Sequence, residues 1–131
     1  HGGGINHRMD LASGMLIKEN HIEACGSISE AVAACYQLET DTWVEVECET
    51  LEQLQEAVLV CPDIILLDNM PLETIRTARA MTPASILLEA SGNITLDNAL
   101  EYALTGINRI AVGAITHSTA ALDLSMRVSR N

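Results

Sequence analysis

Short apolar runs alternate along the chain with stretches in which apolar residues recur at every third or fourth position. A short continuous apolar run is typical of a strand covered on both faces, and the longer spacing is typical of a helix with one buried face. The pattern predicts strands over residues 15–18, 43–48, 64–68, 85–89 and 109–112. Between them it predicts helices over residues 28–38, 51–59, 72–81 and 96–104.

Residues at the predicted helix starts support these assignments. Ser27 and Thr50 precede the first two helices and Thr95 precedes the fourth. Their hydroxyls can accept hydrogen bonds from the free backbone N–H groups of a helix start. Pro71 fits the first turn of the third helix, where its missing N–H costs nothing.

Strands that alternate with helices predict an α/β fold with a parallel sheet. Such a sheet is either doubly wound or part of an α/β barrel, and the pattern alone leaves both open. Five strands cannot close a barrel of this kind, so the barrel alternative requires strands outside this sequence. The 131 residues are enough for one domain.

The composition of the chain excludes some classes of binding partner. The formal net charge is -11, which argues against nucleic acid, because nucleic-acid binding needs a basic surface. No apolar run is long enough to cross a bilayer and the start does not resemble a signal peptide, so we expect no membrane association and a cytoplasmic location. The four cysteines are widely spaced, which argues against a disulfide framework and against a zinc site built from them.

Polar residues gather where the predicted strands end. Lys18, Glu47 and Asp68 lie at the ends of the first three strands, and polar or glycine-bearing loops follow the last two at residues 89–93 and 113–117. Each has an ordinary alternative: Lys18 could be a solvated lysine, Asp68 a helix cap, and one of Glu45 and Glu47 could face outward. Residues 91–93 could form an ordinary turn, and His117 could cap a short C-terminal helix or lie in the core. Ligands of α/β folds bind at the carboxyl ends of strands, so the shared position favours a site.

The residue types suggest the chemistry of that site. Glu47 and Asp68 offer hard oxygen ligands for Mg²⁺ or for sugar hydroxyls. Residues 91–93 precede a predicted helix start, where N–H groups and the helix dipole favour phosphate, and the Gly113 loop is the next one along. A carboxylate would be held by the cations and imidazole of the first segments: His7, Arg8 and Lys18. This arrangement predicts phosphoribosyl transfer to an acidic acceptor.

Six motifs, in order along essentially the whole chain, resemble the C-terminal part of the quinolinate phosphoribosyltransferase family. They are GGGINHR, LIKENHI, WVEVECETLEQL, DIILLDNM, LLEASGNIT and RIAVGAITHSTAALDLSM. The resemblance implies an incomplete α/β barrel that converts quinolinate and phosphoribosyl pyrophosphate into nicotinate mononucleotide, pyrophosphate and CO₂ with Mg²⁺, in NAD biosynthesis. It further implies a homodimer.

The resemblance also implies a role for each site residue. Contacts to the quinolinate carboxylates would come from His7, Arg8 and Lys18. Glu47, rather than Glu45, and Asp68 would bind the ribose hydroxyls and the metal-bound diphosphate, which makes Lys18, Glu47 and Asp68 the expected catalytic set. The phosphate site would be formed by Ser91, Gly92, Asn93, Gly113 and His117.

Several features depart from the family pattern. The family has an N-terminal domain and a Thr-Arg-Lys-Thr-type segment before the glycine turn, and neither is in this sequence. We therefore expect residues 1–131 to be a partial barrel domain that lacks activity alone. Ser13-Gly14 stands where the family usually has an aspartate, and Arg109 is unexpected within a strand.

Three other interpretations compete with this one. A two-component receiver domain would use Asp68 as phospho-acceptor, since residues 64–71 resemble its strand and acceptor. A related molybdenum-transport homologue would share the barrel without the substrate. A third interpretation is a structural piece with no activity of its own.

Overall fold

Five parallel strands form one open sheet in which neighbours in the sequence are neighbours in space. The computed structural model describes residues 3–38, 40–117 and 121–129. The strands are β1 (Met15–Ile17), β2 (Val44–Cys48), β3 (Ile64–Asp68), β4 (Leu87–Ser91) and β5 (Arg109–Ile110). The helices are α1 (Glu19–Cys25), α2 (Ile28–Tyr36), α3 (Leu51–Val60), α4 (Leu72–Met81), α5 (Ala99–Ala103) and α6 (Ala114–His117).

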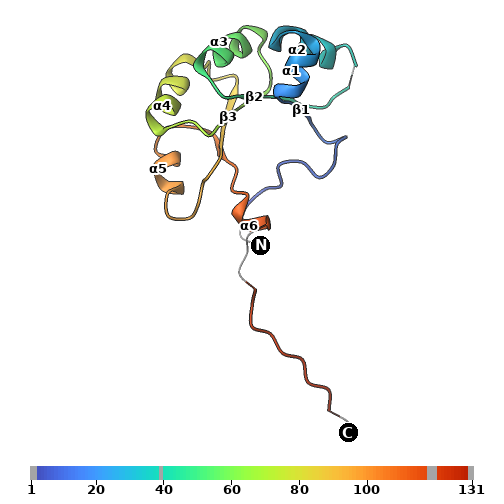
Figure 1. Ribbon diagram of the computed structural model, residues 1–131, viewed down its shortest axis with the longest axis vertical. Helices are drawn as coiled ribbons and strands as arrows, with labels where there is room; N and C mark the ends of the chain where they lie inside the picture. Colours follow the sequence, from blue (N-terminus) through green and yellow to red (C-terminus); the bar gives the residue numbers. More distant parts are fainter. Residues whose placement is uncertain (1–2, 39, 118–120, 130–131) are drawn as a thin grey trace.

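The strand order β1-β2-β3-β4-β5 decides between the two α/β architectures. Each connection moves one strand further in the same direction, and because such crossovers are right-handed, they place the helices on one face of the sheet. Figure 1 shows α1 to α5 along the outside of the curved sheet. A doubly wound sheet reverses its order partway, so the barrel-type alternative is confirmed and the receiver-domain interpretation is wrong.

The predicted caps of the first two helices are confirmed. Ser27 accepts a hydrogen bond from the Glu30 N–H, and Thr50 accepts one from the Gln53 N–H. Pro71 lies at the N-cap position, immediately before α4, and not in the first turn of the helix as predicted. The predicted Thr95 cap is wrong, because α5 begins only at Ala99 and Thr95 instead donates its N–H to the side chain of Asn98.

Two other elements differ from the prediction. Helix α1 was not predicted; it begins directly after Lys18 with polar residues and ends at Gly26, whose positive φ of 100° suits glycine. Strand β4 begins two residues later than predicted, because the Ile86 N–H closes a turn onto Pro83. Glu89, predicted as the last residue of this strand, therefore lies in the middle of β4.

The hydrophobic core lies between the outer face of the sheet and the helices. Val46, Ile65 and Leu88 are adjacent in the register of β2, β3 and β4, and all three are fully buried. Leu54 of α3 and Ile75 of α4 belong to the same cluster. All four cysteines are free thiols. Within the described residues, no helix is both long and apolar enough to cross a membrane.

Leu54→Ala is expected to lower the free energy of unfolding by about 3 kcal/mol, because it leaves a cavity in this core. Denaturant unfolding followed by circular dichroism would measure the change. Leu96→Ala is the matched control, since Leu96 is 91% exposed, and its free energy of unfolding should stay close to that of the original sequence.

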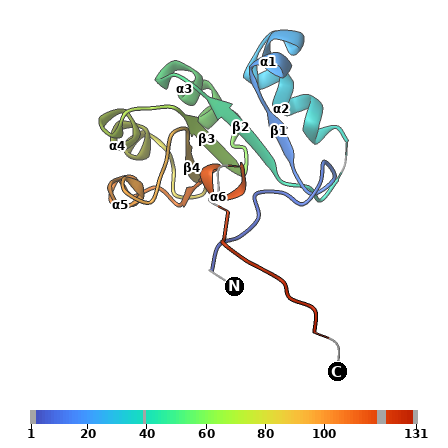
Figure 2. The same cartoon turned by 60° about the horizontal axis from the view of Figure 1, so that its bottom comes forward.

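The opposite, inner face of the sheet is polar at its centre. Glu45 and Glu47 alternate along β2 with the core residues Val44 and Val46 and therefore share the inner face. The segment that precedes β1, blue in Figure 2, passes the lower ends of the strands, and its His7 contacts Glu45 and Glu89 of this face. The concave side thus brings the N-terminal segment and the strand carboxylates together.

Candidate functional site

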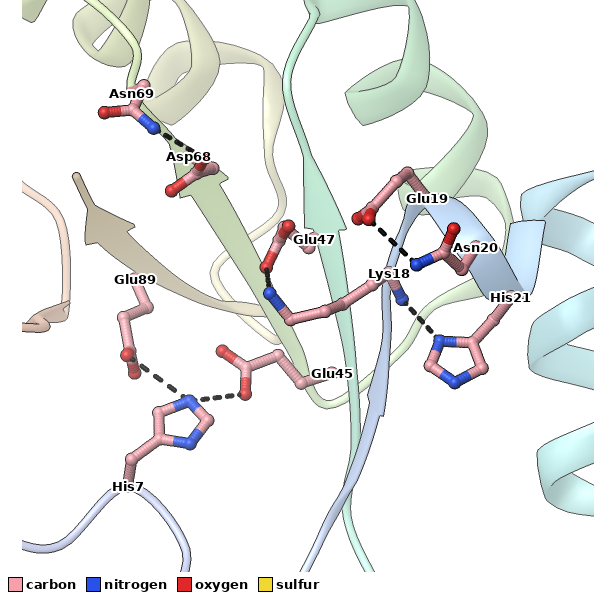
Figure 3. A network of polar contacts seen from close by, with 10 residues as sticks. All are labelled: His7, Lys18, Glu19, Asn20, His21, Glu45, Glu47, Asp68, Asn69 and Glu89. Atoms are coloured by element: carbon pink, nitrogen blue, oxygen red, sulfur yellow. Dashed lines mark hydrogen bonds and ion pairs between the residues drawn. The ribbon is translucent and has the colours of Figure 1, made fainter. Parts of the chain in front are cut away.

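The strand register arranges the inner-face residues in layers. Glu47, Leu66, Glu89 and Arg109 are neighbours across β2 to β5 and form one layer. Asp68 and Ser91, at the ends of β3 and β4, form the next layer toward the carboxyl edge. Figure 3 shows three of these side chains, those of Glu47, Asp68 and Glu89, on one side of the sheet and each on a separate strand.

Lys18 and Glu47 form an ion pair at the centre of this face. The Lys18 Nζ lies 2.8 Å from the Glu47 Oε2, and Glu47 is nearly buried. This hydrogen bond raises the pKa of Lys18, although partial burial opposes the shift. The Lys18 backbone N–H donates to the His21 Nδ1 at 3.0 Å, which fixes the turn from β1 into α1. The cation is therefore held in place from both ends of its residue.

Asp68 is connected to the loop after β4 by a chain of amides. The Asn69 side-chain amide donates to the Asp68 Oδ2 at 2.7 Å, and Asn93 donates to the Asn69 Oδ1 at 3.1 Å. Gly92 has a φ of 93°, and a Cβ at this position would lie 2.2 Å from the Asn69 Oδ1. Only glycine lets the two loops approach this closely.

The structure differs from the prediction at residues 91–93, which were expected to form part of the phosphate site. The Asn93 side chain contacts Asn69, and residues 94–98 separate it from the start of α5. Residues 91–93 therefore do not lie at a helix N-terminus, and the prediction that they do is wrong. The site roles of Ser91, Gly92 and Asn93 remain predictions that rest on the family resemblance and on their place at the strand edge.

His7 lies between two buried carboxylates. Its Nε2 is 2.9 Å from the Glu45 Oε2 and 3.5 Å from the Glu89 Oε1, and its ring makes a T-shaped contact with the ring of Trp43. Glu45 is fully buried and Glu89 is 4% exposed. Sequence reasoning missed both glutamates as parts of this cluster. The alternation of Glu45 with Glu47 was the available signal, and the expectation that one of them could face outward is wrong.

Burial changes the protonation of these carboxyl groups. Loss of solvent first, and then the neighbouring Glu89 carboxylate, raise the pKa of Glu45 to about 8, against the opposing effect of Arg109 and Arg8. Burial also raises the pKa of Glu89, while His7 and Arg109 oppose that shift. Arg109 is the register neighbour of Glu89, which explains an arginine within a strand.

Glu45→Gln is expected to remove part of the pH dependence of stability. The folded-state pKa of about 8 exceeds the ordinary value of 4.5, so the folded state binds more protons between these values. Stability should therefore fall as pH rises from 5 to 8, by on the order of 2 kcal/mol from this group. Unfolding measured at several pH values should show a shallower decline for Glu45→Gln. Glu101→Gln, at an exposed position of α5, should leave the decline unchanged.

A hollow lies beside β5, and Gly113 is the one remaining predicted residue among the lining residues described for it. The hollow measures about 580 Å³, and its lining includes His7, Glu89, Arg109 and Gly113. Gly113 precedes α6, and a Cβ there would lie 2.8 Å from the His117 Nε2. Arg8 donates to the Gly14 carbonyl at 3.2 Å. A cavity of this size can hold a small polar ligand.

The structure brings some predicted residues together and separates others. The central set of Lys18, Glu47 and Asp68 lies on one face, with His7 beside it (Figure 3). Lys18, Arg8 and the His7 imidazole do not form one free anion-binding cluster, because Lys18 and His7 contact the chain's own carboxyl groups. Arg8 contacts a backbone carbonyl at the edge of the group.

The sequential parallel sheet, with its helices along one face and charged side chains on the other, defines the class of an α/β-barrel domain. The family described as quinolinate phosphoribosyl transferase, C-terminal domain, matches residues 1–127. The chain belongs to this family.

Individual relatives agree in sequence and in structure. A probable nicotinate-nucleotide pyrophosphorylase [carboxylating] from Bacillus subtilis is 48% identical over 98% of this chain, and the human nicotinate-nucleotide pyrophosphorylase [carboxylating] is 37% identical over 97% of it. A crystal structure of a NadC deletion mutant superposes with a TM-score of 0.90 at 38% identity, over 97% of this chain and 45% of that one. The nicotinate-nucleotide pyrophosphorylase structure from Francisella tularensis superposes with a TM-score of 0.84 at 43% identity, over 88% of this chain and 41% of that one.

The chain spans just under half the length of these relatives. It covers 45% of the Bacillus subtilis protein and 44% of the human one. The correspondence is therefore with one part of a longer protein in each case.

Proposed function

We propose that the chain forms the barrel part of an enzyme that transfers the phosphoribosyl group of phosphoribosyl pyrophosphate to quinolinate. The products would be nicotinate mononucleotide, pyrophosphate and CO₂, and the reaction would serve NAD biosynthesis. The observation that carries the proposal is the Lys18–Glu47 ion pair beside Asp68 on the inner face, in a chain of this family. The names of the relatives favour this activity over the molybdenum-transport homologue considered above.

The two substrates would occupy adjoining parts of the inner face. The carboxylates of quinolinate would bind to Lys18, His7 and Arg8. At Lys18 and His7 they would replace the chain's own carboxylates as partners. Glu47 and Asp68 would bind the ribose hydroxyls. The loops after β4 and β5, with Ser91, Gly92, Asn93, Gly113 and His117, would hold phosphate. These two loops follow neighbouring strands and so emerge at the same edge of the sheet.

A divalent cation fits beside the proposed binding position of phosphoribosyl pyrophosphate. Glu47, Glu49 and Asp68 each offer a carboxylate oxygen, and these atoms lie within 4.8 Å of one another. Hard oxygen donors of this kind suit Mg²⁺. When bound, Mg²⁺ would neutralise negative charge on the departing pyrophosphate. Glu47 and Asp68 would hold it, directly or through water.

The side chains would act mainly by position and charge. As the bond to pyrophosphate breaks, positive charge develops at the anomeric carbon, and the carboxylates of Glu47 and Asp68 stabilise it. The ring nitrogen of quinolinate forms the new bond to that carbon, so no side chain is needed as a nucleophile. The resulting pyridinium accepts the electron pair of the breaking C–C bond as CO₂ leaves, and a proton takes its place.

The proposal extends to the whole protein. We propose that residues 1–131 work together with an N-terminal domain, since the relatives are more than twice as long as the matched part. We further propose that the whole protein is a homodimer and lies in the cytoplasm. Pyrophosphate release is the direct test. A protein extended to the relatives' length should release pyrophosphate and CO₂ only when both substrates are present, whereas the 131-residue chain alone should be inactive. Robust turnover by the short chain, or none by the long one, would contradict the proposal.

A further inference from the structure

His7, Glu45 and Glu89 form a compact set of donor atoms on the inner face. They come from three separate parts of the chain: the segment before β1, strand β2 and strand β4. One ligand atom of each lies within 4.8 Å of the other two. Figure 3 shows both carboxylates directed at the same edge of the His7 ring, beside the Lys18–Glu47 pair and apart from Asp68.

The contacts within this set are short, yet they do not satisfy Glu45. Its side chain is fully buried, and neither of its oxygens has a hydrogen-bond donor among the described residues. The 2.9 Å approach of the Glu45 Oε2 to the His7 Nε2 therefore lacks hydrogen-bond geometry. A buried carboxylate without a donor is costly, and a bound cation is one way in which proteins compensate it.

The spacing of the three atoms is that of ligands around a common centre. Ligands at about 2.0–2.1 Å from a tetrahedral metal ion are about 3.3 Å from one another. The distances from the His7 Nε2 to the two carboxylate oxygens, 2.9 and 3.5 Å, lie on either side of this value. Two carboxylates also balance the charge of a divalent ion.

We propose that His7, Glu45 and Glu89 form a second divalent-cation site, separate from Glu47 and Asp68, that takes a borderline transition metal such as Zn²⁺. An imidazole nitrogen with two carboxylates suits Zn²⁺, whereas Mg²⁺ prefers oxygen ligands throughout. Three protein ligands leave a fourth position. The hollow of about 580 Å³ that His7 and Glu89 line lies next to it.

Occupation of this site would oppose the proposed reaction. A metal ion bound to the His7 Nε2 uses the nitrogen that would otherwise donate to a substrate carboxylate. Zn²⁺ should therefore raise the apparent dissociation constant of quinolinate. This consequence rests on the proposed function, whereas the metal site itself does not.

Cobalt binding tests the site without reference to activity. Tetrahedral Co²⁺ absorbs visible light, so titration of the full-length protein with CoCl₂ would report occupancy, and Zn²⁺ should displace the signal. We expect one tetrahedral, visibly absorbing Co²⁺ per chain, with its affinity reduced at least 10-fold in Glu45→Gln and in Glu89→Gln. Glu47→Gln, Asp68→Asn and the exposed Glu101→Gln should keep the affinity, and circular dichroism would verify that each variant is folded.

Three results would overturn the proposal. One is no visible band at millimolar Co²⁺. Another is a band lost in Glu47→Gln or Asp68→Asn but kept in Glu45→Gln and Glu89→Gln. The third is a near-ultraviolet thiolate band, which would place the metal on cysteines. If the metal binds as expected but pyrophosphate release is never seen, the proposed function fails and the metal site stands.

Discussion

Asp68→Ala is expected to lower kcat/KM for phosphoribosyl pyrophosphate by about 100-fold, measured by pyrophosphate release from the full-length protein. Asp68 ends β3 at the carboxyl edge of the sheet, and Asn69 donates to one of its oxygens. Removal of the carboxylate takes away a partner of the ribose and of the cation, and contacts of this kind that strengthen in the transition state contribute about 3 kcal/mol.

Asp97→Ala is the matched control. Asp97 is exposed in the loop before α5, so the loss of its negative charge should change kcat/KM less than twofold. Affinity for quinolinate measured alone should stay unchanged in Asp68→Ala. Asp68→Ala activity equal to that of the control would remove Asp68 from the site.

Lys18→Ala is expected to weaken quinolinate binding by about 30-fold, because it removes the central cation of the inner face. Charge-assisted contacts to carboxylates typically contribute about 1.5–3 kcal/mol. Isothermal titration of the full-length protein would measure the dissociation constant directly. Binding of phosphoribosyl pyrophosphate should change much less, since Lys18 belongs to the other half of the proposed site.

The variant also leaves Glu47 nearly buried without its cation, so thermal unfolding must be measured beside binding. Arg76→Ala removes an exposed cation of α4 and controls for net charge. An unchanged quinolinate affinity in a folded Lys18→Ala protein would refute the division of the site into two halves.

Much of the fold was accessible from the sequence because local patterns determine local structure. The alternating residues of β2 and the continuous apolar run of β3 are both clear strand patterns, so the positions of these two strands were predicted closely. Helix α1 escaped prediction because Glu19, Asn20 and His21 give its start no apolar face. The order of the strands required the structure, since a repeating pattern is compatible with either architecture.

The site divides in the same way. Lys18, Glu47 and Asp68 were found because strand ends can be read from the sequence. Glu89 was predicted at the very end of its strand, and the two-residue shift of β4 moves it to the middle of the strand, on the inner face. Its pairing with His7 joins residues more than eighty positions apart. No local pattern contains such a contact.

The pairing of His7 and Lys18 with internal glutamates makes ligand binding an exchange of partners. An incoming anion competes with carboxylates that the fold already holds in place. Its binding free energy is therefore the difference between its own contact with His7 or Lys18 and the internal contact that it replaces. A ligand with one carboxylate can release only one of these two groups, whereas a ligand with two adjacent carboxylates can release both. The protein's own acids therefore set a threshold that favours dianions, and we expect selectivity between mono- and dicarboxylates to depend on them as much as on the cations.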